Sequence, residues 1–515
     1  MSAGVVSTSI WELVRHRAQV DPQRVVVTDE HARALTFAEL HERAVQVAAG
    51  LYARGVRAGD VVSWQLPGRI ETVVLIAALC RLGAVQNPLI PMLRGKELAF
   101  ICGQTGSRVL VVPNAFRGFD HLTMAHSVAA GLPGLDVLDL DAGLPTGDPA
   151  SLPQAVEPQA DQARWIFYTS GTTADPKGAR HTDAGLIAAS RTFCRNMQLV
   201  PDDRVAQLAP IAHVGGVLHL VSTLLVGSRI VTSDVFDPAS TPEQLEAAEV
   251  TIGGSGVPFL QVYLRRQAER PDRPFFGRAR CFLVGGSTRT PALHTRVRDE
   301  LGGIGLVSGY GMTECPYVSW GAIGDSDEHL ATSEGRPAPE VQLKVLDEEG
   351  RPVAPGEPGE LRVKAPQLML GYVDASLDTN AFDEDGFFRS GDIAIIDTEG
   401  YLTITGRIKD VIIRNMENIS AREVEIGALT FPKVADLVAI GLPDADTGER
   451  VVAVAVPTDA QDPPTLEELT AHLRAQGLNP RKLPVQLELV PQLPRNAMGK
   501  VLKNQLKDDL RTTTR

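Results

Sequence analysis

Helical and strand-like hydrophobic patterns alternate along the first 160 residues of the chain. Residues 36–55 repeat apolar side chains at helical spacing, begin with the capping-box pair Thr36 and Glu39, and end at a glycine, so they predict a helix. The short runs VVSWQL (61–66) and RVLVVP (108–113) are typical of buried strands. This alternation predicts a layered α/β architecture.

The alternation returns in three later strand candidates, each of which is followed by small residues. They are SRIVTSD (228–234), RARCFLVGGS (278–287) and IGLVSGYGMTE (304–314). Ligands of open α/β sheets bind beyond the carboxyl ends of the strands. The loops after these three strands are therefore candidate binding edges.

The sequence changes character twice beyond this region. After residue 335 it breaks into short β-rich pieces, in which DEEG (347–350) and DTEG (397–400) predict hairpin turns. After residue 409 it becomes a compact α+β tail. A chain of 515 residues exceeds the roughly 250–300 that one hydrophobic core supports. We therefore expect an N-terminal domain over residues 1–409 and a C-terminal domain over residues 410–515.

Charge and cysteine content limit the classes of partner. Sixty-three acidic residues against fifty basic ones give a net charge of −13, which disfavours binding to nucleic acid or to an anionic membrane. Five scattered cysteines without a CxxC pair suit a reducing, cytoplasmic location and indicate neither a disulfide framework nor a zinc site. No secretory leader is evident at the N-terminus. The most apolar run, residues 73–80, is too short to span a bilayer and predicts a core helix, so no membrane insertion is expected.

The segment YTSGTTADPKG (168–178) gathers glycine, hydroxyl side chains and one lysine at the end of the strand-like run WIFY (165–168). Backbone N–H groups can converge on an anion where glycine removes side-chain bulk, while hydroxyls add donors and Lys177 adds positive charge. The spacing differs from that of the Walker loop, G-x-x-x-x-G-K-[ST]. The segment predicts a phosphate-binding loop of another kind, and taken alone it also fits a polar surface turn.

Other segments carry groups suited to a nucleotide. Residues 308–314, SGYGMTE, offer a flat aromatic that could stack on a base, together with a hydroxyl and a carboxylate suited to a hard cation. Asp392, in SGD, could grip two ribose hydroxyls, and Arg407 follows in GRIKD. Lys500 lies on a glycine-flanked loop in PRNAMGK. Taken singly, Asp392 also fits a plain turn carboxylate and Lys500 a solvated lysine.

In chain order, YTSGTT-x-x-PKG, GYGMTE, GEL, SGD, GRIKD, ENIS-x-x-EVE and PRNAMGK resemble the motifs of the adenylate-forming superfamily, which includes acyl-CoA synthetases, adenylation domains of nonribosomal synthetases and beetle luciferases. The resemblance covers nearly the whole chain. It implies an α/β protein with a large N-terminal domain, made of two layered α/β subdomains and a β-barrel-like subdomain, and a small mobile α+β C-terminal domain.

The resemblance also implies an activity, that of an ATP-dependent acid:CoA ligase. A carboxylate would attack the α-phosphate of ATP to give an acyl-adenylate and pyrophosphate, and the thiol of CoA would then displace AMP. The expected substrate is a short, medium or alicyclic carboxylic acid, with ATP, Mg²⁺ and CoA as the other ligands and a monomer or homodimer as the assembly.

Residues that match the motifs receive roles by the same resemblance. Lys500 would bridge the acyl carboxylate and the α-phosphate, Thr313 would reach the α-phosphate, and His213, in PIAHVGG, would line the acyl pocket near the reacting carboxyl. Glu314 would hold Mg²⁺ together with Thr169, and Asp410 would be the hinge. The residues expected to bind ATP are Thr169, Ser170, Gly171, Thr172, Thr173, Lys177, Gly285, Gly286, Ser287, Tyr310, Gly311, Met312, Asp392 and Arg407. From the residues alone, His213 fits a buried core histidine equally well.

The sequence departs from the motifs in two places, and the second departure bears on the thiol step. Ala174 stands where the phosphate loop usually has glycine, and Asn415 and Met416 stand where many acyl-CoA synthetases have two glycines that leave space for pantetheine. The thiol acceptor could therefore be a carrier protein instead of CoA, and a nucleotide-binding homologue without turnover is a third possibility. Nothing specific favours a luciferase-like oxygenase, and no serine-glycine cluster fits the hydrolase motif G-x-S-x-G.

Overall fold

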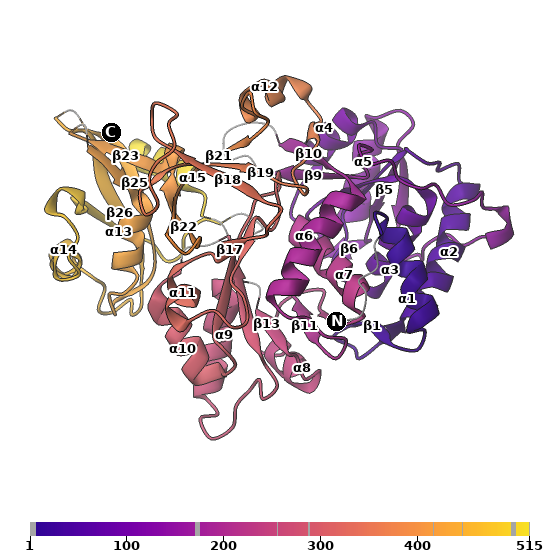
Figure 1. Cartoon of the computed structure of the whole chain (residues 1–515), viewed down its shortest axis with the longest axis horizontal. Helices are drawn as coiled ribbons and strands as arrows, with labels where there is room; N and C mark the ends of the chain where they lie inside the picture. Colours follow the sequence, from indigo (N-terminus) through magenta and orange to yellow (C-terminus); the bar gives the residue numbers. More distant parts are fainter. Residues whose placement is uncertain are drawn as a thin grey trace.

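Two large sheets make up most of the N-terminal part of the chain (Figure 1). The computed structural model describes residues 7–169, 176–254, 256–286, 289–415, 417–444, 446–495 and 501–513. The first sheet has the strand order β20 (Gly371–Tyr372), β10 (Lys177–His181), β9 (Trp165–Thr169), β4 (Val85–Pro88), β3 (Val61–Trp64), β5 (Val109–Val112) and β8 (Asp136–Asp139). From β9 to β8 its strands are parallel, and β10 and β20 add an antiparallel edge.

The second sheet is parallel in its centre and antiparallel at both edges. Its strand order is β17 (Arg336–Pro337), β16 (Ser319–Trp320), β15 (Leu306–Tyr310), β14 (Cys281–Gly285), β13 (Ile252–Gly254), β11 (Arg204–Gln207), β12 (Arg229–Thr232), β1 (Val25–Thr28) and β2 (Ala34–Thr36). The strands predicted at 61–66, 108–113, 228–234, 278–287 and 304–314 are all confirmed within these two sheets.

One hydrophobic core joins both sheets to the helices between them. Those helices are α1 (Ile10–Val20), α2 (Phe37–Ala53), α3 (Ile70–Leu82), α6 (Asp183–Asn196) and α7 (Val214–Val226). The capping box of Thr36 and Glu39 is present at the start of α2, as predicted. Helix α3 is buried almost all round, which explains why its sequence is apolar without a polar face. In the described ranges, no helix combines the length and apolar character needed to cross a bilayer.

The remaining helices of this region are shorter or lie on the outside of the sheets (Figure 1). They are α4 (Gly95–Thr105), α5 (His121–Ala130), α8 (Thr241–Ala247), α9 (Val257–Ala268), α10 (Pro291–Leu301), α11 (Asp327–Thr332) and α12 (Asp378–Ala381), with the 3₁₀ turns η1 (Pro149–Ser151) and η2 (Ala375–Leu377). A small hairpin precedes α5, and its two strands, β6 (Ala115–Phe116) and β7 (Phe119–Asp120), have two residues each.

A four-stranded antiparallel sheet follows the second large sheet in the chain. Its order is β18 (Gln342–Leu346), β19 (Gly359–Lys364), β21 (Phe388–Ile396) and β22 (Leu402–Arg407). The predicted turn DTEG joins β21 to β22, and Gly400 takes the left-handed φ of 83° that such a turn requires. This sheet corresponds to the β subdomain implied by the resemblance.

The chain changes sheets at the short 3₁₀ turn η3 (Ile408–Asp410). The C-terminal unit beyond it holds the strands β24 (Glu417–Ser420), β23 (Val411–Arg414), β26 (Gly448–Pro457) and β25 (Val434–Asp444), with β27 (Gln486–Leu489) alongside β26. Its helices are α13 (Ala421–Ala428), α14 (Leu466–Ala475) and α15 (Lys503–Thr513), with the turn η4 (Pro480–Lys482). A large N-terminal and a small C-terminal domain of mixed α/β structure are thus confirmed, while the boundary at residue 409 and the mobility of the small domain stay predictions.

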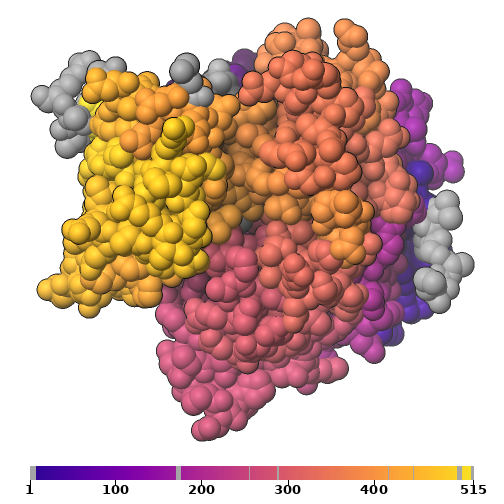
Figure 2. Space-filling model, turned by 60° about the vertical axis from the view of Figure 1, so that its left-hand side comes forward, coloured from indigo at the N-terminus to yellow at the C-terminus, as the bar shows by residue number. Residues whose placement is uncertain are grey.

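The small domain, yellow in Figure 2, packs against the β-rich and second α/β parts of the chain. Arg422, on α13, pairs with Glu334 of the large domain at 3.0 Å. The same Glu334 oxygen pairs with Arg289 at 3.1 Å, and its second oxygen accepts a hydrogen bond from the Ile404 backbone N–H at 2.9 Å. Glu334 is only 5% exposed. One buried carboxylate therefore holds an arginine from each domain.

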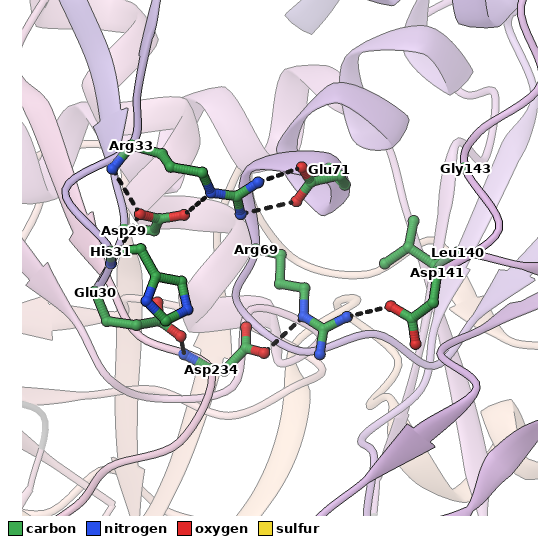
Figure 3. Close-up of a pocket in the computed structure, with 10 residues that line it drawn as sticks. All are labelled: Asp29, Glu30, His31, Arg33, Arg69, Glu71, Leu140, Asp141, Gly143 and Asp234. Carbon is green, nitrogen blue, oxygen red and sulfur yellow. Dashed lines mark hydrogen bonds and ion pairs between the residues drawn. The ribbon is translucent and has the colours of Figure 1, made fainter.

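A separate charged cavity of about 410 Å³ lies where the two large sheets meet (Figure 3). Arg69, at the start of α3, points between Asp141 and Asp234, and its ion pairs with both measure 2.6 Å. Asp141 follows β8, an edge strand of the first sheet, and Asp234 follows β12 of the second sheet. Burial raises the pKa of the Asp234 carboxyl, although Arg69 opposes that rise. Arg69 is thus a clamp between the two sheets.

Replacing Arg69 with methionine should lower the free energy of unfolding by about 1.5–3 kcal/mol, because a partly buried carboxylate then loses its charged partner. The deficit should shrink as the pH falls through the raised pKa of Asp234, because the protonated acid needs no counter-charge. Urea unfolding at several pH values measures both effects. Arg15→Met is the matched control, since the Arg15 side chain is 53% exposed in its pair with Glu12. Equal losses in the two variants would contradict the clamp.

Candidate active site

The turn after β15 crosses from the second sheet to the edge of the first. There the ring of His181, on β10, donates a hydrogen bond from Nε2 to the Thr313 carbonyl at 2.8 Å. Burial lowers the pKa of His181 to about 4, so the ring is neutral and its single proton lies on Nε2. A Cβ atom at Gly311 would lie 2.6 Å from the Tyr317 backbone nitrogen, so the turn requires glycine there. The motif GYGMTE is therefore fixed against the strand that follows the predicted phosphate loop.

The two ends of the predicted phosphate loop lie side by side. Thr169 is the last residue of β9 and pairs with Lys177, the first residue of β10. The loop thus leaves the carboxyl end of a strand and returns to the same edge, where backbone N–H groups can face an anion. Lys177 is exposed, and its Nζ lies 5.7 Å from the centre of the Tyr372 ring.

Tyr310, Asp392 and Arg407 form one hydrogen-bonded unit. The Tyr310 hydroxyl donates to Asp392 Oδ2 at 2.6 Å, and Arg407 Nε pairs with Asp392 Oδ1 at 2.8 Å. Asp392 and Arg407 are direct partners in the ladder between β21 and β22. Burial, reinforced by Asp392, raises the pKa of Tyr310 well above its usual value, so the phenol remains a donor. Asp392 is 2% exposed, and each of its oxygens keeps a second lone pair that could accept from a ligand hydroxyl.

Glu314 has one carboxylate oxygen engaged and one available. The Tyr372 hydroxyl donates to Oε1 at 2.8 Å, whereas Oε2 has no hydrogen-bond partner among the described residues. A hard carboxylate oxygen suits Mg²⁺. The part of the chain that the structure describes contains no cluster of three or more side chains able to hold a metal ion. A magnesium ion at Glu314 would accordingly take most of its ligands from phosphate and water, which is the usual arrangement for this ion.

His213 lines a small apolar cavity beside these groups. It caps the start of α7, where Nδ1 accepts a hydrogen bond from the Gly215 N–H at 3.2 Å, and burial lowers its pKa to about 4. The free space is about 40 Å³, enough for a few water molecules. The walls are Pro88, Leu89, Ile90, Leu93, Ile101, Phe167, Tyr168, Thr169, Pro176, Ala212, His213, Val214 and Thr313. The end of the phosphate strand, the neutral imidazole and the GYGMTE turn therefore share one cavity.

The other predicted ATP-binding residues divide into two groups. Gly285 ends β14 and pairs with Gly309, and Gly286 takes a left-handed φ of 70°. Met312 is partly buried against the four-stranded sheet. Ser170, Gly171, Thr172, Thr173, Ser287 and Lys500 lie outside the described residues, as does Met416.

Two sequence families match this chain, one on each side of η3. The family described as AMP-binding enzyme matches residues 14–373, and the family described as AMP-binding enzyme C-terminal domain matches residues 423–500. The chain belongs to the AMP-binding enzyme family. This confirms the resemblance to the adenylate-forming superfamily.

Relatives of this AMP-binding enzyme use different thiols. It is 30% identical to the medium-chain fatty-acid–CoA ligase of Escherichia coli strain K12, over 98% of this chain and 90% of that protein. It is 34% identical to the salicyl-AMP ligase / salicyl-S-ArCP synthetase of Mycobacterium tuberculosis, over 94% and 88% of the two chains. Its structure is similar to that of ATP-bound MatB from Rhodopseudomonas palustris, with a TM-score of 0.87 and 28% identity over 99% and 100% of the chains.

Several residues of this AMP-binding enzyme site escaped the sequence analysis. Tyr372 and His181 contact the GYGMTE turn, yet no spacing in the sequence connects them to it. The aliphatic cavity wall, including Leu89 and Ile90, comes from a segment far from every motif. A GY pair at 371–372 is the one local signal, because Gly371 takes a φ of 128° that favours glycine.

Proposed function

We propose that this AMP-binding enzyme is an ATP-dependent acid:CoA ligase for a short, medium or alicyclic carboxylic acid. The observation that carries the proposal is the shared cavity of Thr169, His213 and Thr313. Its apolar walls suit the carbon skeleton of an acid, and we infer that the carboxylate reacts near Thr169 and Thr313, which line the same cavity. Because the free space is small, the wall side chains must move to admit the acid.

In the first step, a carboxylate oxygen bonds to the α-phosphorus of ATP while the bond from that phosphorus to the β-phosphate oxygen breaks, and pyrophosphate leaves. Lys177 and Thr169 hold the phosphates, and Asp392 with Arg407 holds the ribose. Because the His213 ring is neutral, it does not form an ion pair that would hold the substrate carboxylate away from the α-phosphorus. Mg²⁺ at Glu314, when bound, neutralises phosphate charge. The positive charge of Lys500 stabilises the negative charge that develops at the α-phosphate.

In the second step, the thiol sulfur bonds to the acyl carbonyl carbon, the carbon–oxygen bond to AMP breaks, and the thiol proton passes to solvent. We infer that the small domain rotates about Asp410 between the steps, since one cleft then serves two reactions in turn. Asp410 lies in η3, the segment at which the chain changes sheets.

A carrier-protein thiol is the second candidate acceptor, and the backbone at Asn415 bears on it. Asn415 is exposed and takes a φ of 51°, the left-handed region that glycine favours and asparagine tolerates best among other residues. The loop thus keeps a glycine-like conformation while carrying a side chain. The relative that is a salicyl-S-ArCP synthetase keeps this alternative open.

A pyrophosphate-release screen tests the proposed function. A panel of aliphatic, alicyclic, aromatic and steroid-derived acids is assayed with ATP and Mg²⁺, first without a thiol and then with free CoA or with a phosphopantetheinylated carrier protein. Acid-dependent pyrophosphate release followed by acyl-CoA formation supports the ligase. Acyl transfer to the carrier protein but not to CoA would make the carrier protein the thiol acceptor. The absence of pyrophosphate release with every acid would overturn the proposal.

Replacing Asn415 and Met416 together with glycine should speed the CoA step several-fold, because side-chain bulk is removed from the loop expected beside the pantetheine arm. The adenylation rate should stay unchanged, since this loop serves only the second step. Single-turnover thiolysis of isolated acyl-adenylate measures the first quantity, and pyrophosphate exchange measures the second. A variant with unchanged thiolysis would show that these side chains do not narrow the channel.

A further inference from the structure

The segment that ends in Tyr372 holds Glu314 at two points. The Met369 backbone N–H donates to the Glu314 carbonyl at 2.8 Å, and the Tyr372 hydroxyl donates to the Glu314 carboxylate at 2.8 Å. Glu314 and Tyr372 are 58 residues apart in the sequence. Both the backbone and the side chain of Glu314 are thus fixed by one distant segment, residues 369–372.

Tyr372 is itself held firmly. It lies on β20, where it pairs with Ala179 of β10, and its backbone N–H donates to Asp378 Oδ1 at 2.9 Å. Its side chain belongs to a buried cluster with Met369 and Phe388. The phenol has few alternative orientations, because the residue is only 5% exposed.

The neighbouring strand supports the same turn. His181, also on β10, donates to the Thr313 carbonyl at 2.8 Å, one residue before Glu314. At the other end of β10, Lys177 lies 5.7 Å from the centre of the Tyr372 ring. The β10–β20 pair therefore contacts both the peptide before Glu314 and the Glu314 carboxylate. It also carries Lys177, the lysine at the end of the phosphate loop.

We propose that Tyr372 is a positioning residue that presents the Glu314 carboxylate to the divalent cation. Its hydroxyl holds Oε1 and leaves Oε2 to bind the ion. A carboxylate fixed in this way loses less rotational freedom when the cation arrives, and loss of such a supporting hydrogen bond typically weakens metal binding about 10–100-fold. This inference rests on the proposed function, in which Glu314 holds the metal of the ATP complex.

The test is Tyr372→Phe, which keeps the buried ring and removes only the hydroxyl. Binding of Mn²⁺ is measured by electron paramagnetic resonance in the presence of α,β-methylene-ATP, an analogue that cannot form an adenylate. We expect the dissociation constant for Mn²⁺ to rise about tenfold, while the affinity for the analogue at saturating Mn²⁺ stays the same. Tyr401→Phe is the matched control, since that hydroxyl donates to Asp325 at 2.8 Å away from the site.

Glu314→Gln separates the possible failures. If the unmodified enzyme binds no Mn²⁺ with the analogue, or if Glu314→Gln binds it as tightly as the unmodified enzyme, the metal assignment of the proposed function fails. If Glu314→Gln weakens Mn²⁺ binding and Tyr372→Phe does not, the positioning role alone is overturned. Equal weakening in Tyr372→Phe and Tyr401→Phe would also overturn it, because the effect would then be a general loss of stability.

Discussion

Replacing Lys500 with alanine should lower acid-dependent pyrophosphate exchange by about 10³-fold, because a positive charge aimed at the developing phosphate charge is lost. Thiolysis of supplied acyl-adenylate should remain largely intact, since the lysine acts only in the first step. Lys500 itself lies outside the described residues, but the loop that carries it is closed by a β-bridge between Arg495 and Val501. The two half-reactions are measured separately on the same preparation.

Lys507→Ala is the control for this prediction. It removes a lysine of the same domain from α15, a helix that begins three residues after Lys500. Both half-reactions should then proceed at the rate of the unmodified enzyme. If Lys500→Ala slowed exchange and thiolysis to the same degree, the lysine would serve both steps, and the proposed rotation of the small domain between them would be wrong.

Replacing Asp392 with alanine should raise the KM for ATP about 10–100-fold, since charged hydrogen bonds to the ribose hydroxyls are lost. The KM for the acid should change far less, because Asp392 does not line the His213 cavity. Steady-state kinetics with each substrate varied in turn give both constants. An ATP KM equal to that of the unmodified enzyme would refute the ribose assignment.

The buried environment of Asp392 calls for a second variant. Alanine at this position leaves Arg407 and the Tyr310 hydroxyl without their carboxylate, so part of any loss could be structural. Tyr310→Phe breaks the same hydrogen bond but keeps the carboxylate. If the ribose assignment is correct, Tyr310→Phe raises the KM for ATP much less than Asp392→Ala does. Equal increases would indicate that the intact network matters more than the contact with ribose.

Local patterns were enough to predict several of the elements. The helix α2 follows from a capping box and helical spacing, and β14 and β15 follow from short apolar runs that lead into small residues. The turn at residues 397–400 follows from its glycine. These features depend on neighbouring residues, so the sequence contains the information needed to predict them.

The contacts that complete the site depend on distant residues. Tyr372 meets Glu314 because β20 joins the edge of the first sheet, a pairing of only two residues. Its sequence, GY, is too short to predict a strand. The sequence suggested that Tyr310 stacks on a base, but it could not reveal that the same side chain donates to Asp392. Such links arise from packing between sheets, which no local pattern encodes.

The two arginines on Glu334 affect the energetics of the proposed rotation. If the small domain departs, Arg422 leaves with it, whereas Arg289 remains attached to the large domain. The carboxylate would then keep a counter-ion throughout the movement and would never be stranded as a bare buried charge, which typically costs about 3–5 kcal/mol. The second arginine thus makes the contact between the domains reversible.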